Sequence, residues 1–127
     1  MGNKIKILLI DDDADYVDNF GWFLERKGYS VFKATSGREG IKIAQKENPR
    51  IVLCDLIMLD INGDEVIRKI KSFNPDTITV MVSAYVDDQT KEKLKKLGAY
   101  SYEEKIVKFK PTEEYIRRIL EKKHIAQ

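Results

Sequence analysis

The sequence predicts an α/β domain built on a doubly wound parallel sheet, and three observations support this fold class. Short β-rich runs alternate with helical patterns five times, which is typical of successive βαβ units. The first and third of these runs are continuously apolar, as expected for strands that helices cover on both faces. The length of 127 residues corresponds to one core, so we expect residues 1–127 to form a single domain.

Five strands are expected, and four of them are short, mainly apolar runs. Their ranges are 5–10, 30–34, 51–54, 78–82 and 100–104. The last run, YSYEE, is the least apolar of the five. A parallel arrangement follows because each strand is separated from the next by a helical segment.

Helical periodicity predicts five helices between and after these strands. Their ranges are 14–27, 37–47, 64–72, 88–97 and 112–124. Gly28 is a typical helix terminator, and Ser36 with Glu39 forms a capping box at the start of the second helix. Thr112 precedes two glutamates and therefore suits the start of the last helix.

Right-handed crossovers favour the flavodoxin-like strand order 2-1-3-4-5 for this five-stranded parallel sheet. In such a sheet the functional crevice lies at the carboxyl ends of the strands, beside the switch point between the first and third strands. The residues expected there are Asp11, Asp12, Asp55, Ser83 and Lys105.

Composition and charge exclude several classes of protein. Hydrophobic residues make up 43% and charged residues 35% of the chain, as in a globular domain. The apolar runs are far shorter than the roughly 20 residues of a membrane span, and no signal peptide is evident, so we expect a cytoplasmic protein. The net charge of +2 and the interleaved acids of the basic stretch 91–123 favour a solvated helical face over a nucleic-acid groove. Cys54 is the only cysteine, so no intrachain disulfide can form.

The expected crevice brings three carboxylates together without a compensating cation. Such groups repel one another, so their convergence calls for a metal ion, and oxygen ligands favour Mg²⁺. A lysine and a hydroxyl beside the metal would complete a site for phosphoryl oxygens. Asp55 stands alone at the end of the central strand and is the best-placed nucleophile, with an aspartyl phosphate as the product.

Four segments of the chain lie at the predicted carboxyl edge of the sheet or lead to it. They are Leu9-Ile10-Asp11-Asp12-Asp13, Cys54-Asp55-Leu56-Ile57-Met58 with Gly63 following, Val82-Ser83-Ala84, and Gly98-Ala99 leading through Tyr102 to Lys105. With these segments the chain resembles the response-regulator receiver domains of the CheY-like family over essentially its full length. The resemblance implies a phosphoacceptor of a two-component system or phosphorelay, in which a sensor histidine kinase or a phosphotransfer protein supplies the phosphoryl group to Asp55.

The same resemblance assigns roles to the surrounding residues. Mg²⁺ would be bound by Asp12, Asp55, the Ile57 carbonyl and, through water, Asp11. Ser83 and Lys105 would bind phosphoryl oxygens, and Tyr102 would be the aromatic switch that follows Ser83 inward.

The chain departs from the family at two positions that are usually proline, Leu59 and Ile106. A Lys110-Pro111 pair occurs farther along, which makes Lys110 the alternative for the lysine role, although the spacing favours Lys105. Ile57 and Tyr85 are expected to shield the acyl phosphate from water and so to slow dephosphorylation. The alternative is that both side chains merely line the rim.

Taken singly, the site residues have ordinary structural alternatives. Asp11 and Asp12 are typical helix-capping acids, Asp55 could begin a turn, and Ser83 could cap a helix.

Three functions are compatible with the sequence. The leading one is a signalling switch without an output domain, which catalyses only its own phosphorylation and dephosphorylation. The second is a Mg²⁺-dependent phosphohydrolase, whose acid/base would be needed where Ile57 stands. The third is a flavodoxin-like or degenerate receiver domain that only binds a partner.

Overall fold

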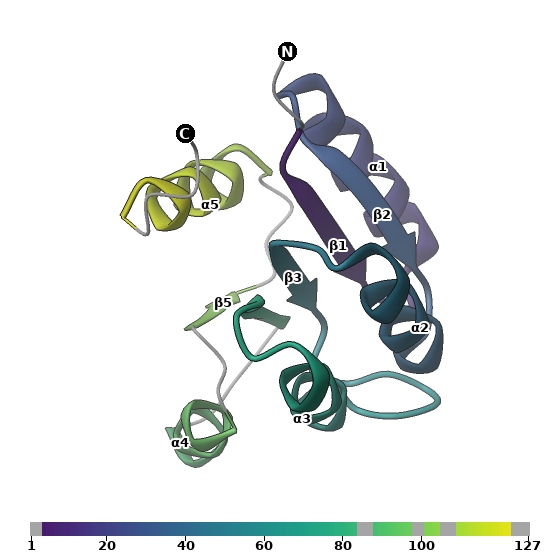
Figure 1. Ribbon diagram of the computed structural model, residues 1–127, viewed down its shortest axis with the longest axis vertical. Coiled ribbons are helices and arrows are strands. Elements are labelled where there is room, and N and C mark those ends of the chain that lie inside the picture. Colours follow the sequence, from purple (N-terminus) through teal and green to yellow (C-terminus); the bar gives the residue numbers. More distant parts are fainter. Residues whose placement is uncertain (1–3, 84–87, 98–100, 105–108, 123–127) are drawn as a thin grey trace.

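The computed structural model describes residues 4–83, 88–97, 101–104 and 109–122. The strands are β1 (Lys6–Ile10), β2 (Ser30–Ala34), β3 (Ile51–Cys54), β4 (Ile78–Ser83) and β5 (Ser101–Glu104). They pair in parallel in the order β2-β1-β3-β4-β5 (Figure 1). The predicted α/β class and the parallel sheet with β1 and β3 at its centre are confirmed.

The helices are α1 (Ala14–Arg26), α2 (Gly37–Glu47), α3 (Gly63–Phe73), α4 (Asp88–Lys96) and α5 (Phe109–Lys122). The first four agree with the predicted ranges to within one residue at each end. The expected start of the last helix at Thr112 is wrong, because α5 begins at Phe109. Pro111 therefore lies in the first turn, where its missing N–H breaks no helical hydrogen bond.

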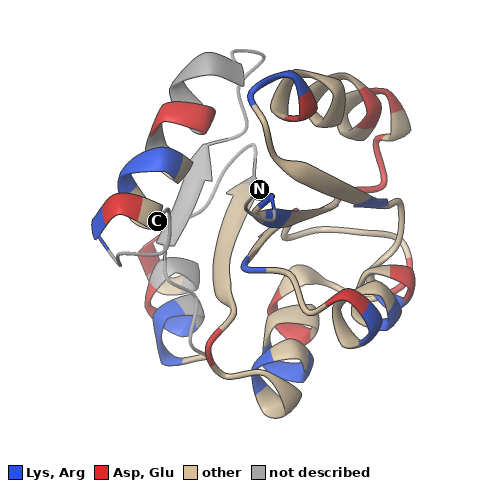
Figure 2. Ribbon diagram, turned by 45° about the horizontal axis from the view of Figure 1, so that its top comes forward, with Lys and Arg blue, Asp and Glu red and all other residues tan. Residues whose placement is uncertain are grey.

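Helices cover both faces of the sheet, which explains the continuous apolar runs of the central strands. Ile7 and Leu9 of β1 pack in one core cluster with residues of α1 and α5. Leu8 and Ile10 pack in a second cluster with residues of α2 and α3. Side chains alternate between the two faces along a strand, so the four consecutive residues from Ile7 to Ile10 are all buried because both faces have a core. The charged residues lie mainly on the helices and loops around the sheet (Figure 2).

Local signals in the sequence define the helix ends. The Ser36 hydroxyl accepts a hydrogen bond from the Glu39 N–H at 3.2 Å, and the Glu39 carboxylate accepts one from the Thr35 N–H at 2.9 Å. Gly28 follows α1 with a φ of +102°, a left-handed conformation that glycine adopts without a steric penalty. Within the described ranges, every helix is too short or too polar to cross a bilayer.

Candidate functional site

Three carboxylates converge at the carboxyl ends of the two central strands. Asp11 and Asp12 follow β1, and Asp55 follows β3, whose last residue Cys54 lies beside Ile10 in the sheet. One oxygen from each carboxylate lies within 4.8 Å of the other two. Asp11 is 2% exposed, Asp55 is half-buried and Asp12 faces solvent. The predicted convergence of these residues is therefore present in the structure.

Backbone hydrogen bonds extend the strand pairing into the site. The Asp55 N–H donates to the Ile10 carbonyl at 2.9 Å, and the Asp11 N–H donates to the Ala34 carbonyl at 3.1 Å. Both aspartates are thus fixed by the sheet rather than by a free loop. This placement gives their carboxylates a defined position relative to each other.

The helix-capping role belongs to Asp13, not to Asp11 or Asp12. The Asp13 carboxylate accepts a hydrogen bond from the Tyr16 N–H at 3.1 Å at the start of α1. Asp11 Oδ1 accepts one from the Asp13 N–H at 2.9 Å, so Asp11 contacts the capping residue through its side chain. Two of the three consecutive aspartates therefore remain in the acidic cluster.

Gly63 holds the start of α3 against the acceptor segment. A Cβ atom at this position would lie 2.3 Å from the Asp55 carbonyl oxygen and 2.5 Å from Met81 Cε. The Gly63 N–H donates to the Leu56 carbonyl at 2.7 Å. Only glycine allows so close an approach, so Gly63 contributes to placing Asp55.

The residues present fit a hard divalent cation. Carboxylate oxygens are the ligands that Mg²⁺ prefers, and it commonly takes one or two carboxylates while keeping several waters. Asp11, Asp12 and Asp55 form the only group of three or more potential metal-ligating side chains found among the described residues. A half-exposed acidic cluster of this kind suits an ion that must also contact a ligand arriving from solvent.

Tyr16 is a neighbour of the site that the sequence reasoning missed. Together with Asp11 and Asp55 it lines a small cavity of about 10 Å³. Burial, and then the negative charges of Asp11, Asp55 and Asp13, raise the pKa of the Tyr16 hydroxyl above its usual value. Spacing could have suggested this position, since Tyr16 lies in the first turn of the helix that directly follows the acidic residues.

Cys54 packs within the sheet directly before Asp55. It is fully buried, and its thiol donates a hydrogen bond to the Asp55 carbonyl oxygen at 3.3 Å. Burial, and next the charge of Asp55, raise the pKa of the Cys54 thiol well above its usual value. A buried thiol in the protonated form is a poor nucleophile, so the contribution of Cys54 is to packing.

The structure describes only some of the other predicted site residues. Ser83 ends β4 and pairs with Glu104, while Tyr102 lies in β5 and pairs with Met81. The Ile57 side chain is 68% exposed, as the rim alternative requires. Three other predicted positions lie outside the described residues: Lys105, Ile106 and Tyr85.

Asp60 is a second residue whose contacts the sequence did not reveal. Its carboxylate accepts hydrogen bonds from the Gly37 N–H at 3.0 Å and the Arg38 N–H at 2.9 Å, at the start of α2. These bonds, chiefly the one from Arg38, lower the pKa of the Asp60 carboxyl. Asp60 therefore ties the segment after Asp55 to α2 from 23 residues away in the chain.

Comparison with known proteins shows which family the chain resembles. The profile of the response regulator receiver domain matches residues 7–120. The chain is 31% identical over 101 residues to the transcriptional regulatory protein ZraR of Klebsiella oxytoca, covering 80% of this chain and 23% of that protein. It is 31% identical over 99 residues to protein PilH of Pseudomonas aeruginosa, covering 76% of this chain and 82% of PilH. The chain thus spans about a quarter of the length of the ZraR proteins that it matches.

Solved structures show the same similarity in three dimensions. A receiver domain protein from Methanospirillum hungatei superposes with a TM-score of 0.92 at 26% identity, covering 98% of this chain and all of the other. A receiver domain protein from Clostridium thermocellum gives a TM-score of 0.86 at 26% identity, with coverages of 97% and 99%.

Proposed function

Because this chain belongs to the response regulator receiver domain family of two-component systems, we propose that it is a signalling switch that accepts a phosphoryl group on Asp55. The observation that carries the proposal is the convergence of Asp11, Asp12 and Asp55 within 4.8 Å at the carboxyl edge of the sheet. The phosphoryl donor would be the phosphohistidine of a sensor histidine kinase or phosphotransfer protein in the cytoplasm.

Mg²⁺ would be held by Asp12, Asp55 and the Ile57 carbonyl, with Asp11 acting through water. Bound there, the ion would supply positive charge that lowers the repulsion between the acceptor carboxylate and phosphoryl oxygens. Asp11 suits the outer position because it is buried and its Oδ1 already accepts the Asp13 N–H. Asp12 suits direct contact because it faces solvent.

Asp55 would act as the nucleophile. One carboxylate oxygen would form a bond to phosphorus as the bond from phosphorus to the donor imidazole breaks, and the imidazole would leave with the bonding electron pair. Orientation by the sheet would favour this step, because the Asp55 backbone is fixed to Ile10 and approached closely by Gly63.

The remaining predicted residues would bind the product and report its formation. Ser83, at the end of β4, and Lys105 would contact phosphoryl oxygens, and Tyr102 would respond to movement of Ser83 and alter the surface offered to a downstream partner. No acid/base function is available from the aliphatic Ile57, which disfavours the phosphohydrolase alternative.

The test is incubation with acetyl phosphate and Mg²⁺ followed by intact mass measurement. We expect the wild type to gain one phosphoryl group and Asp55→Asn to gain none. Asp60→Asn is the matched control, since it changes a nearby carboxylate outside the acidic cluster and should still be phosphorylated. A mass gain in Asp55→Asn would contradict the assignment of the acceptor.

A further inference from the structure

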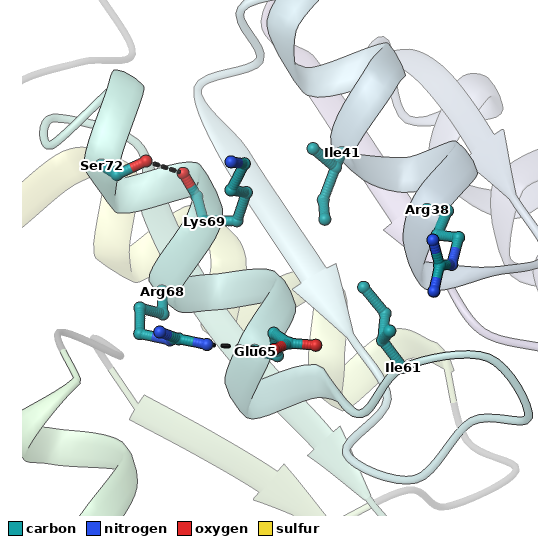
Figure 3. A pocket seen from close by; sticks show the side chains of 7 residues that line it. All are labelled: Arg38, Ile41, Ile61, Glu65, Arg68, Lys69 and Ser72. Atoms are coloured by element: carbon teal, nitrogen blue, oxygen red, sulfur yellow. Dashed lines mark hydrogen bonds and ion pairs between the residues drawn. The ribbon is translucent and has the colours of Figure 1, made fainter.

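A groove with a volume of about 510 Å³ lies between α2 and α3 (Figure 3). None of its lining residues belongs to the acidic cluster. Arg38 and Ile41 line it from α2, and Ile61 lines it from the segment before α3. The residues contributed by α3 are Glu65, Arg68, Lys69 and Ser72. This volume is within the range of roughly 300–1,000 Å³ that is typical of ligand sites.

The groove has an aliphatic floor. Ile41 and Ile61 point toward each other across it (Figure 3). Both are partly buried and pack against the core cluster beneath α2 and α3. The floor is therefore backed by the protein core and can accept an apolar side chain without rearrangement of the fold.

The rim carries an excess of positive charge. Three of the seven lining residues are cationic and one is acidic. Glu65 pairs with Arg68 at 3.0 Å, while Arg38 is 3.9 Å from Asp60. Lys69 has no ion-pair partner among the described residues, so a positive charge in this groove remains available for an anionic ligand.

The exposure of the rim indicates an open surface. The Arg38 side chain is 74% exposed and the Arg68 side chain 65%. Such cations remain hydrated and interact modestly with each partner charge, so several carboxylates would have to act together. A segment of a polypeptide can present carboxylates and an aliphatic side chain along the same groove.

We propose that the groove between α2 and α3 is a docking site for an acidic segment of a partner protein that inserts an aliphatic side chain between Ile41 and Ile61. Carboxylates of the segment would contact Lys69, Arg38 and Arg68. Nucleic acid fits less well, because none of the lining residues is aromatic and the floor offers no ring for base stacking. This docking does not depend on phosphorylation of Asp55.

The experiment uses the unphosphorylated chain and a short fluorescent synthetic peptide of glutamates with leucine at every third or fourth position. We expect saturable binding that weakens as salt is added. Lys69→Glu should raise the dissociation constant by about fivefold or more, since it reverses one rim charge. Lys46→Glu makes the same change on the exposed surface of α2 outside the groove, and should alter the constant by less than about twofold.

A second measurement locates the peptide. In methyl NMR spectra the signals of Ile41 and Ile61 should shift on binding, whereas that of Ile43, which does not line the groove, should shift much less. A peptide with serine in place of leucine should bind more weakly, because it has no side chain for the floor.

Several results would overturn the proposal. They are an absence of binding, equal weakening by Lys69→Glu and Lys46→Glu, and undiminished binding of the serine peptide. Equal or tighter binding of a single-stranded oligothymidylate, lost in Lys69→Glu, would instead assign the groove to nucleic acid.

Discussion

Among the residues whose burial the structure describes, two carboxylates are almost completely buried, and their surroundings are opposite. Asp11 is 2% exposed and lies at the carboxyl edge of the sheet with Asp12 and Asp55 beside it. Glu113 is 1% exposed and lies on α5, where it contacts Tyr29, the residue before β2. One carboxylate is grouped with like charges, and the other is surrounded by hydrogen-bond donors.

Glu113, Arg117 and Tyr29 form a cluster, called the Glu113 cluster here, in which protein groups donate hydrogen bonds to both oxygens of the buried carboxylate. Arg117 Nη2 donates to both Glu113 carboxylate oxygens, at 2.9 and 3.0 Å, and the Tyr29 hydroxyl donates to Oε2 at 3.2 Å. Such a cluster connects α5 to the residue before β2 and has no need of an external ligand. The acidic cluster, in contrast, gathers negative charge whose repulsion an external cation would relieve. The charges beside a buried carboxylate, rather than its burial, therefore decide whether a cation from outside the protein would stabilise it.

The largest effect on the free energy of unfolding is expected from disrupting the Glu113 cluster. Glu113→Ala should lower the free energy of unfolding by about 2 kcal/mol, because it leaves the Tyr29 hydroxyl without this acceptor and creates a cavity. Urea denaturation measures the change. Glu114→Ala, on the exposed neighbour, is the control and should cost less than about 0.5 kcal/mol. Equal effects would mean that the Glu113 contacts do not stabilise the fold.

The second-largest effect is expected on the rate of dephosphorylation, which depends on whether the acidic cluster is partly shielded from solvent after phosphorylation. Ile57→Asn combined with Tyr85→Ala should speed loss of the phosphoryl group about tenfold, equivalent to about 1.4 kcal/mol of barrier, if these side chains exclude the attacking water. The decay is followed by intact mass with saturating Mg²⁺. An unchanged rate would favour the alternative in which Ile57, already 68% exposed, only lines the rim.

A smaller effect on the free energy of unfolding is expected from relieving the repulsion among the carboxylates of the acidic cluster. Without metal, Asp12→Ala should raise the free energy of unfolding at neutral pH by on the order of 1 kcal/mol. Mg²⁺ should raise the melting temperature of the wild type more than that of the variant, because the variant has lost a ligand. Asp15→Ala is the control: Asp15 lies in the first turn of α1, where its removal should weaken the helix slightly. Equal responses of wild type and Asp12→Ala to Mg²⁺ would show that Asp12 does not bind the ion.

The contrast between these clusters also explains what could be predicted from the sequence. Asp11, Asp12 and Asp55 were predictable because each follows a strand, and parallel strands bring their carboxyl ends to one edge. The contact between Tyr29 and Glu113 was not, because it joins residues 84 positions apart through side chains whose directions no periodicity specifies.

The starts of two helices show the same limit on what the sequence predicts. Ser36 and Glu39 define the start of α2 through contacts with their immediate neighbours, so the pattern was sufficient. Thr112 gave an equally plausible start for the last helix, yet α5 begins at Phe109. Acidic residues favour the first turn of a helix but are not confined to it, so Glu113 and Glu114 did not locate the start of α5.

The smallest effect concerns the pH dependence of the stability that the Glu113 cluster contributes. Burial, and then the negative charge of Glu113, raise the pKa of Tyr29 from 10.0 to about 12. A raised pKa means that folding favours the neutral hydroxyl, so this contribution is fully present below pH 10 and is lost as the pH rises from about 10 to about 12. At about pH 10.5 the loss should be below about 1 kcal/mol. Tyr29→Phe lacks the titrating group, so the advantage of the wild type over this variant in urea denaturation should be constant near pH 8 to 9 and shrink above about pH 10. A difference that stays constant throughout would show that the Tyr29 hydroxyl titrates in the folded protein as it does in the unfolded chain, and that Glu113 exerts no net effect on it.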